Sequence, residues 1–235
     1  MSSPNNAREA ILGRIREALQ DVPRAEQPEA VPVVRSYRLR GVDGAAERET
    51  LIEHFIERVA DYQVTLRRVQ EQDLQAAITA SCAARGVRRL VVPADLPESW
   101  LPANLDILRD EPLLTNEQLD TSDGVLTGCA LGIAQTGTIV LDGGTTQGRR
   151  VLTLLPDYHL CIIFEEQIID LVPEAINQLT DAVRQHQRPM TFISGPSATS
   201  DIELNRVEGV HGPRTLDVLV ARTGESERKG GSHAS

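Results

Sequence analysis

Short apolar segments rich in Val, Ile and Leu alternate along this chain with longer amphipathic segments. Strands are expected near residues 62–69, 88–93 (RRLVVP), 105–108 (LDIL), 159–164 (HLCIIF), 190–194 (MTFIS) and 216–221 (LDVLVA). Helical spacing of apolar residues predicts helices over 45–60, 72–84 and 173–187. Short buried strands that alternate with helices favour an α/β fold with a mainly parallel sheet flanked by helices.

The apolar spacing also predicts which side of each helix faces the core. The expected inward residues are Leu51, Ile52, Phe55, Ile56 and Val59 in the first helix, Leu74, Ala77, Ile78 and Cys82 in the second, and Ile176, Leu179, Val183 and His186 in the third. Only 3% of the residues are aromatic, so the core must be built mainly from aliphatic side chains.

The two ends of the chain differ from this body. Residues 5–20 predict a separate amphipathic helix with Ile11, Leu12, Ile15 and Leu19 on one face, and three prolines in the stretch after it indicate a linker. We therefore divide the chain into an N-terminal helix with its linker (1–34), an α/β domain (35–221) and a flexible polar tail (222–235). The apolar face of the first helix is expected to dock on the same chain, and docking on a partner is the alternative.

The middle of the chain has a different composition. Residues 124–148 read GVLTGCALGIAQTGTIVLDGGTTQG, rich in glycine, threonine and β-branched residues. We expect strands near 126–134 and 138–141, joined and followed by glycine turns.

Composition argues against several classes of protein. The net charge of −10 and the scarcity of aromatic rings disfavour binding to nucleic acid or to an acidic membrane surface. No apolar run reaches the roughly 18 residues of a membrane span, and the N-terminus does not resemble a signal peptide, so we expect a cytoplasmic protein.

The cysteines and histidines indicate no metal centre. Cys82, Cys129 and Cys161 lie far apart in apolar stretches, so buried inert thiols in a reducing compartment are expected and no iron–sulfur cluster is expected on this chain. The five histidines have no metal-binding spacing. We therefore expect no metal and no cofactor on this chain.

The loop after the strand at 190–194 is the first candidate site. In an open α/β sheet, ligands bind beyond the carboxyl ends of the strands, and small hydroxyl residues before a helix can bind a small carboxylate or phosphate. The candidate ligand-binding residues here are Ser194, Gly195, Ser197, Thr199 and Asp201. Ser200 and Glu203 form a capping-box pattern that a helix start alone explains.

Two further clusters could belong to the same pocket. His211, Gly212 and Arg214 form the second, in which His211 is the candidate catalytic acid or base and Arg214 could hold an anion in a bidentate manner. The third is Thr136, Gly137 and Thr138, which offer hydroxyl and backbone donors. A turn hydrogen bond for His211 and a salt bridge from Arg214 to Asp201, Glu203 or Glu208 are the purely structural alternatives.

Two long segments resemble a known family. Residues 192–221 (FISGPSATSDIELNRVEGVHGPRTLDVLVA) resemble the C-terminal signature of the lactate utilization protein C (LutC) family, and 132–144 (GIAQTGTIVLDGG) resemble its central segment. The resemblance covers most of the chain. It implies the LUD domain, which is similar to the ribose-phosphate isomerase and CoA-transferase superfold.

The resemblance also implies a function. Members of this family act with two iron–sulfur partner proteins in oxidising L-lactate to pyruvate, so this chain would be a non-redox subunit and the clusters would lie on its partners. Gln135 stands where such sequences often have Asp or Glu, and Glu165 and Glu166 are expected as a solvated helix start rather than as a nucleophile. A stand-alone enzyme for a small phosphorylated or acyl (CoA-type) substrate and a non-catalytic assembly module remain alternatives.

Overall fold

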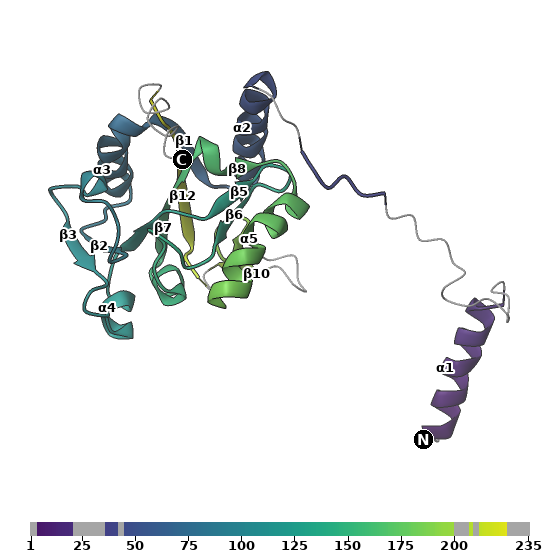
Figure 1. Ribbon diagram of the computed structural model, residues 1–235. Helices are drawn as coiled ribbons and strands as arrows, with labels where there is room; N and C mark the ends of the chain where they lie inside the picture. Colours follow the sequence, from purple (N-terminus) through teal and green to yellow (C-terminus); the bar gives the residue numbers. More distant parts are fainter. Residues whose placement is uncertain (1–3, 21–35, 42–44, 200–206, 209–211, 225–235) are drawn as a thin grey trace. The chain divides into compact units, whose positions relative to one another are not determined.

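The computed structural model describes residues 4–20, 36–41, 45–199, 207–208 and 212–224 (Figure 1). The chain forms two compact units, 1–38 and 39–235. The first contains helix α1 (Pro4–Ala18), where the sequence predicts a helix. Its side chains Ile11, Ile15 and Leu19 are exposed within that unit, and the expected docking of this helix stays a prediction.

The second unit holds the α/β body. Its helices are α2 (Ala45–Ala60), α3 (Leu74–Ala84), α4 (Asn116–Asp120) and α5 (Val172–His186), with short 3₁₀ helices η2 (Glu71–Asp73), η3 (Glu98–Trp100), η4 (Arg150–Thr153) and η5 (Glu165–Gln167). Its strands are β1 (Thr65–Gln70), β2 (Arg89–Val92), β3 (Asp106–Arg109), β4 (Gly124–Thr127), β5 (Leu131–Ile133), β6 (Thr138–Leu141), β7 (Tyr158–Phe164), β8 (Ile168–Ile169), β9 (Thr191–Ile193), β10 (Ala198–Thr199), β11 (Val207–Glu208) and β12 (Thr215–Arg222).

Six strands form the predicted parallel sheet, in the order β1-β12-β7-β4-β2-β3. Every neighbouring pair is parallel, and the register places His159 of β7 between Val125 of β4 and Leu216 of β12. Helix α3 covers one face through Leu74 and Ile78. The expectation of a mainly parallel sheet flanked by helices is confirmed.

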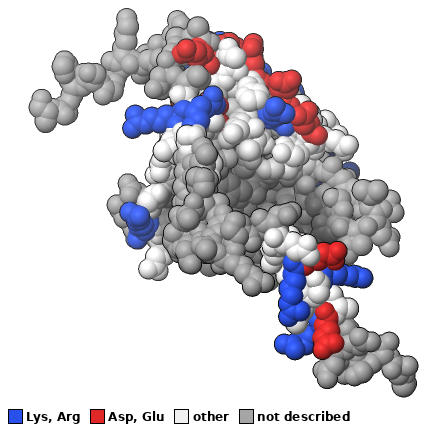
Figure 2. Space-filling model, turned by 90° about the vertical axis from the view of Figure 1, so that its right-hand side faces the viewer, with Lys and Arg blue, Asp and Glu red and all other residues white. Residues whose placement is uncertain are grey.

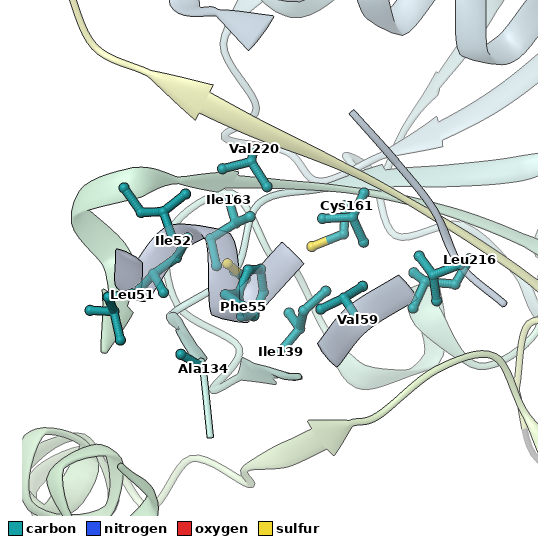
Figure 3. Close-up of a cluster of buried hydrophobic side chains, with 14 of the residues drawn as sticks. Leu51, Ile52, Phe55, Val59, Ala134, Ile139, Cys161, Ile163, Leu216 and Val220 are labelled. Atoms are coloured by element: carbon teal, nitrogen blue, oxygen red, sulfur yellow. The ribbon is translucent and has the colours of Figure 1, made fainter. Parts of the chain in front are cut away.

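A second sheet covers the opposite face together with α2. Its order is β8-β5-β6-β9; β5 and β8 are parallel, and β6 is antiparallel to both β5 and β9. Side chains from α2 and both sheets pack into one cluster in which Phe55 is fully buried beside Ile163 (Figure 3). Helix α5 packs on the outer face of the second sheet through Ala175 and Leu179.

Two expectations about these elements are wrong. The single strand expected over 126–134 is two strands, β4 and β5, which belong to different sheets. All residues of both strands are buried, so an apolar pattern gives no sign that the chain changes sheet at residues 128–130. The inward face of α5 is also different, because Ile176 and Val183 are 43% and 37% exposed while the small Ala175 is buried. The side chain of His186 lies outside the described part of the chain.

The strands β9 and β10 change the setting of the first candidate loop. The expectation that Ser194 follows a strand of the parallel sheet is wrong. Ser194 follows β9, which belongs to the second sheet and is antiparallel to β6. The expected helix after this loop falls on residues 200–206, outside the described residues. Around that stretch, β10 pairs antiparallel with β11.

Glu165 is buried in an ion cluster at the carboxyl ends of three parallel strands, which corrects the expectation of a solvated helix start. Its carboxylate lies 2.5 Å from Arg68 Nε and 3.8 Å from Arg222 Nε, and only 5% of the residue is exposed. Arg68 also pairs with Glu49 of α2, and both acids raise the pKa of its guanidinium. The cluster therefore fastens β1, β7, β12 and α2 to one another.

This cluster predicts a loss of stability in Glu165→Gln. The amide leaves Arg68 and Arg222 without their buried counter-charge, so the free energy of unfolding should fall by roughly 1.5–3 kcal/mol in denaturant titration. Glu166→Gln is the matched control, because Glu166 is the exposed neighbour. Equal stabilities for the two variants would contradict a structural role for this ion cluster.

Candidate functional site

Two adjoining pockets open between the second sheet, η4 and the parallel sheet. The larger pocket has a volume of about 520 Å³ and the smaller pocket about 240 Å³. Arg150, Thr153 and Thr191 line both, so the two form one continuous cleft. A combined cleft of this size is typical of small-molecule sites.

The smaller pocket brings together residues from the first predicted cluster, which begins at Ser194, and the second, which begins at His211. Ser194, Gly195 and Ser197 line it, and so does Gly212. A backbone hydrogen bond of 2.8 Å from Ser197 N to Pro213 O joins the two loops. His159 and Leu216 also line this pocket, and both lie at the amino ends of parallel strands. The pocket therefore borders the edge of the parallel sheet opposite to the one that we expected.

A chain of hydroxyl groups connects the third cluster to the same place. Thr136 Oγ1 lies 2.7 Å from Thr138 Oγ1, which lies 2.8 Å from Ser194 Oγ. Thr136 and Thr138 line neither pocket, so they stand behind Ser194 rather than in the cavity. Their position suits them to orient the Ser194 hydroxyl.

Two of the predicted glycines have a structural reason to be glycine. Gly137 has a φ of +60°, and a Cβ there would lie 2.6 Å from the carbonyl carbon of Arg58 in α2. Gly195 has a φ of +91°, and a Cβ there would lie 2.7 Å from the Cβ of Tyr62. Both positions let the backbone approach α2 and the residues after it at close range.

The remaining predicted residues are distributed differently. Arg214 is exposed, lies 3.5 Å from Asp157 and lines neither pocket, so the expected salt bridge goes to another acid. Thr199 belongs to β10, and its side chain is not described. Asp201 and His211 lie outside the described residues.

The smaller pocket also contains a histidine, His159, for which the sequence pattern predicted no role. His159 is 1% exposed, and its Nε2 lies 2.8 Å from Thr127 Oγ1. Burial, together with the positive charge of Arg150, lowers the pKa of His159 to about 4, so its imidazole is neutral at pH 7. The sequence signal was a histidine at the start of an otherwise apolar strand.

Arg150 is the second residue that sequence reasoning missed. It follows the glycine-rich segment at the first position of η4, and its Nη1 donates to the Thr153 carbonyl oxygen at 2.9 Å and to Thr153 Oγ1 at 3.0 Å. Burial lowers the pKa of its guanidinium. Within the described residues, Arg150 pairs with no carboxylate.

Acidic groups face the larger pocket, which lies beyond the carboxyl ends of β2 and β3. Asp110 binds Arg149 at 2.8 and 2.9 Å, and Asp142 Oδ1 accepts from Gly144 N at 2.9 Å and from Gln147 Nε2 at 2.8 Å. Asp95 also lines this pocket. The segment 124–148, which is rich in glycine and threonine, thus reaches the cleft through Gly143 and Gly144 and the neighbouring carboxylate of Asp142.

The cysteines and Gln135 are placed away from the cleft. All three cysteines are buried, as expected, and burial raises the pKa of Cys82 to about 11 and holds that of Cys129 well above its usual value. Gln135 Oε1 accepts from Val172 N at the start of α5 at 3.4 Å. Among the residues described, no group of three or more His, Cys, Asp or Glu side chains is placed to hold a metal ion.

Surface charge and helix length give two further observations. Figure 2 shows acidic and basic side chains lying beside one another on one face of the molecule.

No helix within the described ranges is both long enough and apolar enough to cross a lipid bilayer.

The fold and cleft define an α/β protein with a pocket that is lined by a cation and several hydroxyl-bearing residues. The family model for the LUD domain matches residues 52–221, and the chain belongs to the LUD domain family. It is a LutC-like protein: it is 45% identical over 194 residues to lactate utilization protein C of Deinococcus radiodurans, covering 83% of this chain and 87% of the relative.

Two further comparisons also cover most of the chain. An uncharacterized protein of Neisseria meningitidis is 26% identical, over 91% of this chain and 93% of its own length. The crystal structure of a DUF162 family protein from Deinococcus radiodurans is similar with a TM-score of 0.65 and 40% identity, covering 74% of this chain and 98% of that one. The resemblance seen in the sequence is thereby confirmed.

Gly137→Ala tests whether the fold needs a glycine at this position. The alanine Cβ meets α2 backbone at a positive φ, so the free energy of unfolding should fall by on the order of 3 kcal/mol or more. Gly86→Ala is the matched control, because Gly86 has a φ of +69° with nothing within 4 Å of a Cβ, and should cost roughly 1–2 kcal/mol. Equal losses in chemical denaturation would mean that the approach to α2 is not tight.

His159 should make stability depend on pH. Its pKa is about 4 in the folded protein against 6.5 for the free side chain, so the unfolded state binds the proton first as pH falls. Between pH 7.5 and pH 5 the wild type should lose about 2 kcal/mol more than His159→Gln, measured by denaturant titration at both pH values. Parallel pH profiles for the two proteins would show that the buried imidazole is not the cause.

Proposed function

We propose that this chain is a non-redox subunit that supports the oxidation of L-lactate to pyruvate in the cytoplasm, together with two iron–sulfur partner proteins. The observation that carries the proposal is the 45% identity to a protein named lactate utilization protein C, over 83% of this chain. The LUD domain model independently spans residues 52–221, which include most of the α/β body.

The cleft supports a role with a small anionic ligand. Arg150 offers a guanidinium, and Thr191, Ser194 and Ser197 offer hydroxyl groups in the same pocket. A hydroxyl group both donates and accepts a hydrogen bond, so this set suits either the alcohol of lactate or the ketone of pyruvate. Thr136, Gly137 and Thr138 support Ser194 from behind, and Gly195 and Gly212 shape the wall. Thr199, Asp201, His211 and Arg214 remain candidates from the sequence pattern alone.

The partners would supply the electron transfer. Lactate oxidation releases two electrons, and an iron–sulfur cluster held by four cysteines needs one more cysteine than this chain has. The two iron–sulfur proteins that the LutC resemblance implies would therefore accept the electrons. On this proposal the present chain binds and orients the carboxylic acid or holds the complex together.

Deletion of the gene tests the proposal. The deletion strain should lose growth on L-lactate as sole carbon source, and a plasmid-borne copy of the gene should restore it. Growth of the deletion strain on pyruvate is the control, because pyruvate enters metabolism after the proposed step. Normal growth on L-lactate, in a strain without a second related gene, would refute the proposed function.

A further inference from the structure

We propose that Arg150 anchors the carboxylate of a small 2-hydroxy or 2-oxo monocarboxylic acid in the smaller pocket. This inference deepens the proposed function by naming the anchor and the ligand class of the site. It rests on that function only for the choice of L-lactate and pyruvate as probes.

The geometry of Arg150 is the first observation. Nη1 is fixed by Thr153, and no hydrogen bond from Nε or Nη2 reaches another described residue. Other arginines of the body, such as Arg68, Arg85 and Arg149, pair with a carboxylate at 2.9 Å or less. A guanidinium that is partly removed from water and faces a cavity without a counter-charge is arranged to receive an anion.

Charge matching decides which anion fits. Among the described residues that line the smaller pocket, Arg150 is the only one with a charge at pH 7, because burial keeps His159 neutral. One positive charge balances a monocarboxylate, whereas a phosphate monoester carries close to two negative charges at neutral pH. The pocket therefore favours a monocarboxylate over a phosphorylated ligand.

The neighbouring pocket determines where the carboxylate lies. Asp95, Asp110 and Asp142 line the larger pocket together with Arg149, Arg150 and Arg188, so the positive charges among its described lining residues are already balanced by negative ones. The smaller pocket instead presents the hydroxyl groups of Thr191 and Ser194 on the wall formed by β9 and the residue that follows it. A volume of about 240 Å³ is ample for an acid of three or four carbons.

The hydroxyl network gives the specificity for an oxygen next to the carboxylate. Ser194 Oγ is held by Thr138 Oγ1 at 2.8 Å, so its orientation is fixed before a ligand enters. A second oxygen on the ligand can exchange a hydrogen bond with this hydroxyl. An acid without that oxygen would lose this hydrogen bond and should bind more weakly.

Binding to the purified full-length protein tests this proposal. L-lactate, pyruvate, propionate and inorganic phosphate are titrated by isothermal calorimetry into the wild type, Arg150→Met, Arg150→Lys and Arg88→Met. L-lactate or pyruvate should bind more tightly than propionate and phosphate. Arg150→Met should weaken that binding at least tenfold, Arg150→Lys should weaken it less, and Arg88→Met should leave it unchanged, because Arg88 is exposed and lines neither pocket.

The outcomes separate this inference from the proposed function. Unchanged lactate and pyruvate affinity in Arg150→Met, tighter binding of phosphate than of the acids, or no binding of either acid would overturn the anchor. Ser194→Ala serves as a second variant if Arg150→Met does not fold, and it should reduce the preference for L-lactate over propionate. An unchanged preference would overturn the Ser194 contact. If Arg150→Met abolishes binding but the deletion strain itself grows normally on L-lactate, the anchor stands and the proposed function fails.

Discussion

The close contact between the two sheets is the constraint on which the rest of the body depends. Phe55 of α2 is fully buried where Ile163 of the parallel sheet meets Gly132 of the second sheet (Figure 3). A Cβ on Gly132 would lie 2.5 Å from Ile163 Cδ1 and 2.9 Å from Phe55 Cε2, so the sheets can approach this far only with glycine there. The second sheet is thereby held over the face of β7 that carries His159, and the cleft forms beside this contact.

Arg68 and Arg150 lie in different electrostatic environments. Arg68 is surrounded by Glu49 and Glu165 and fastens strands to α2, so its charge is satisfied within the fold. Arg150 faces a cavity and has only Thr153 as a hydrogen-bond partner among the described residues. No ion pair within the described fold balances this cation, and the carboxylate ligand that we propose would supply the counter-charge.

Membership of the LUD domain family fits this arrangement. The matched region, residues 52–221, contains the second sheet, all but the last residue of the parallel sheet, and every described residue that lines the cleft. The segment 132–144 that resembles the family serves both the fold and the cleft, because Gly132 and Gly137 allow close approach to α2 while Gly143 and Gly144 line the larger pocket. The smaller pocket is lined instead by residues of β9, η4 and the start of β7, among others.

The sequence by itself determined the alternation of strands and helices, the parallel sheet and the burial of the cysteines, because these follow from local periodicity and apolar character. It also indicated Ser194, Ser197 and Gly212 as neighbours of a pocket. Only the tertiary structure decided that β4 and β5 belong to different sheets, that Ser194 meets Thr138 and that Arg150 meets His159. The physical reason is that a buried strand looks the same in either sheet, and the pairing of distant segments depends on packing that no local pattern records.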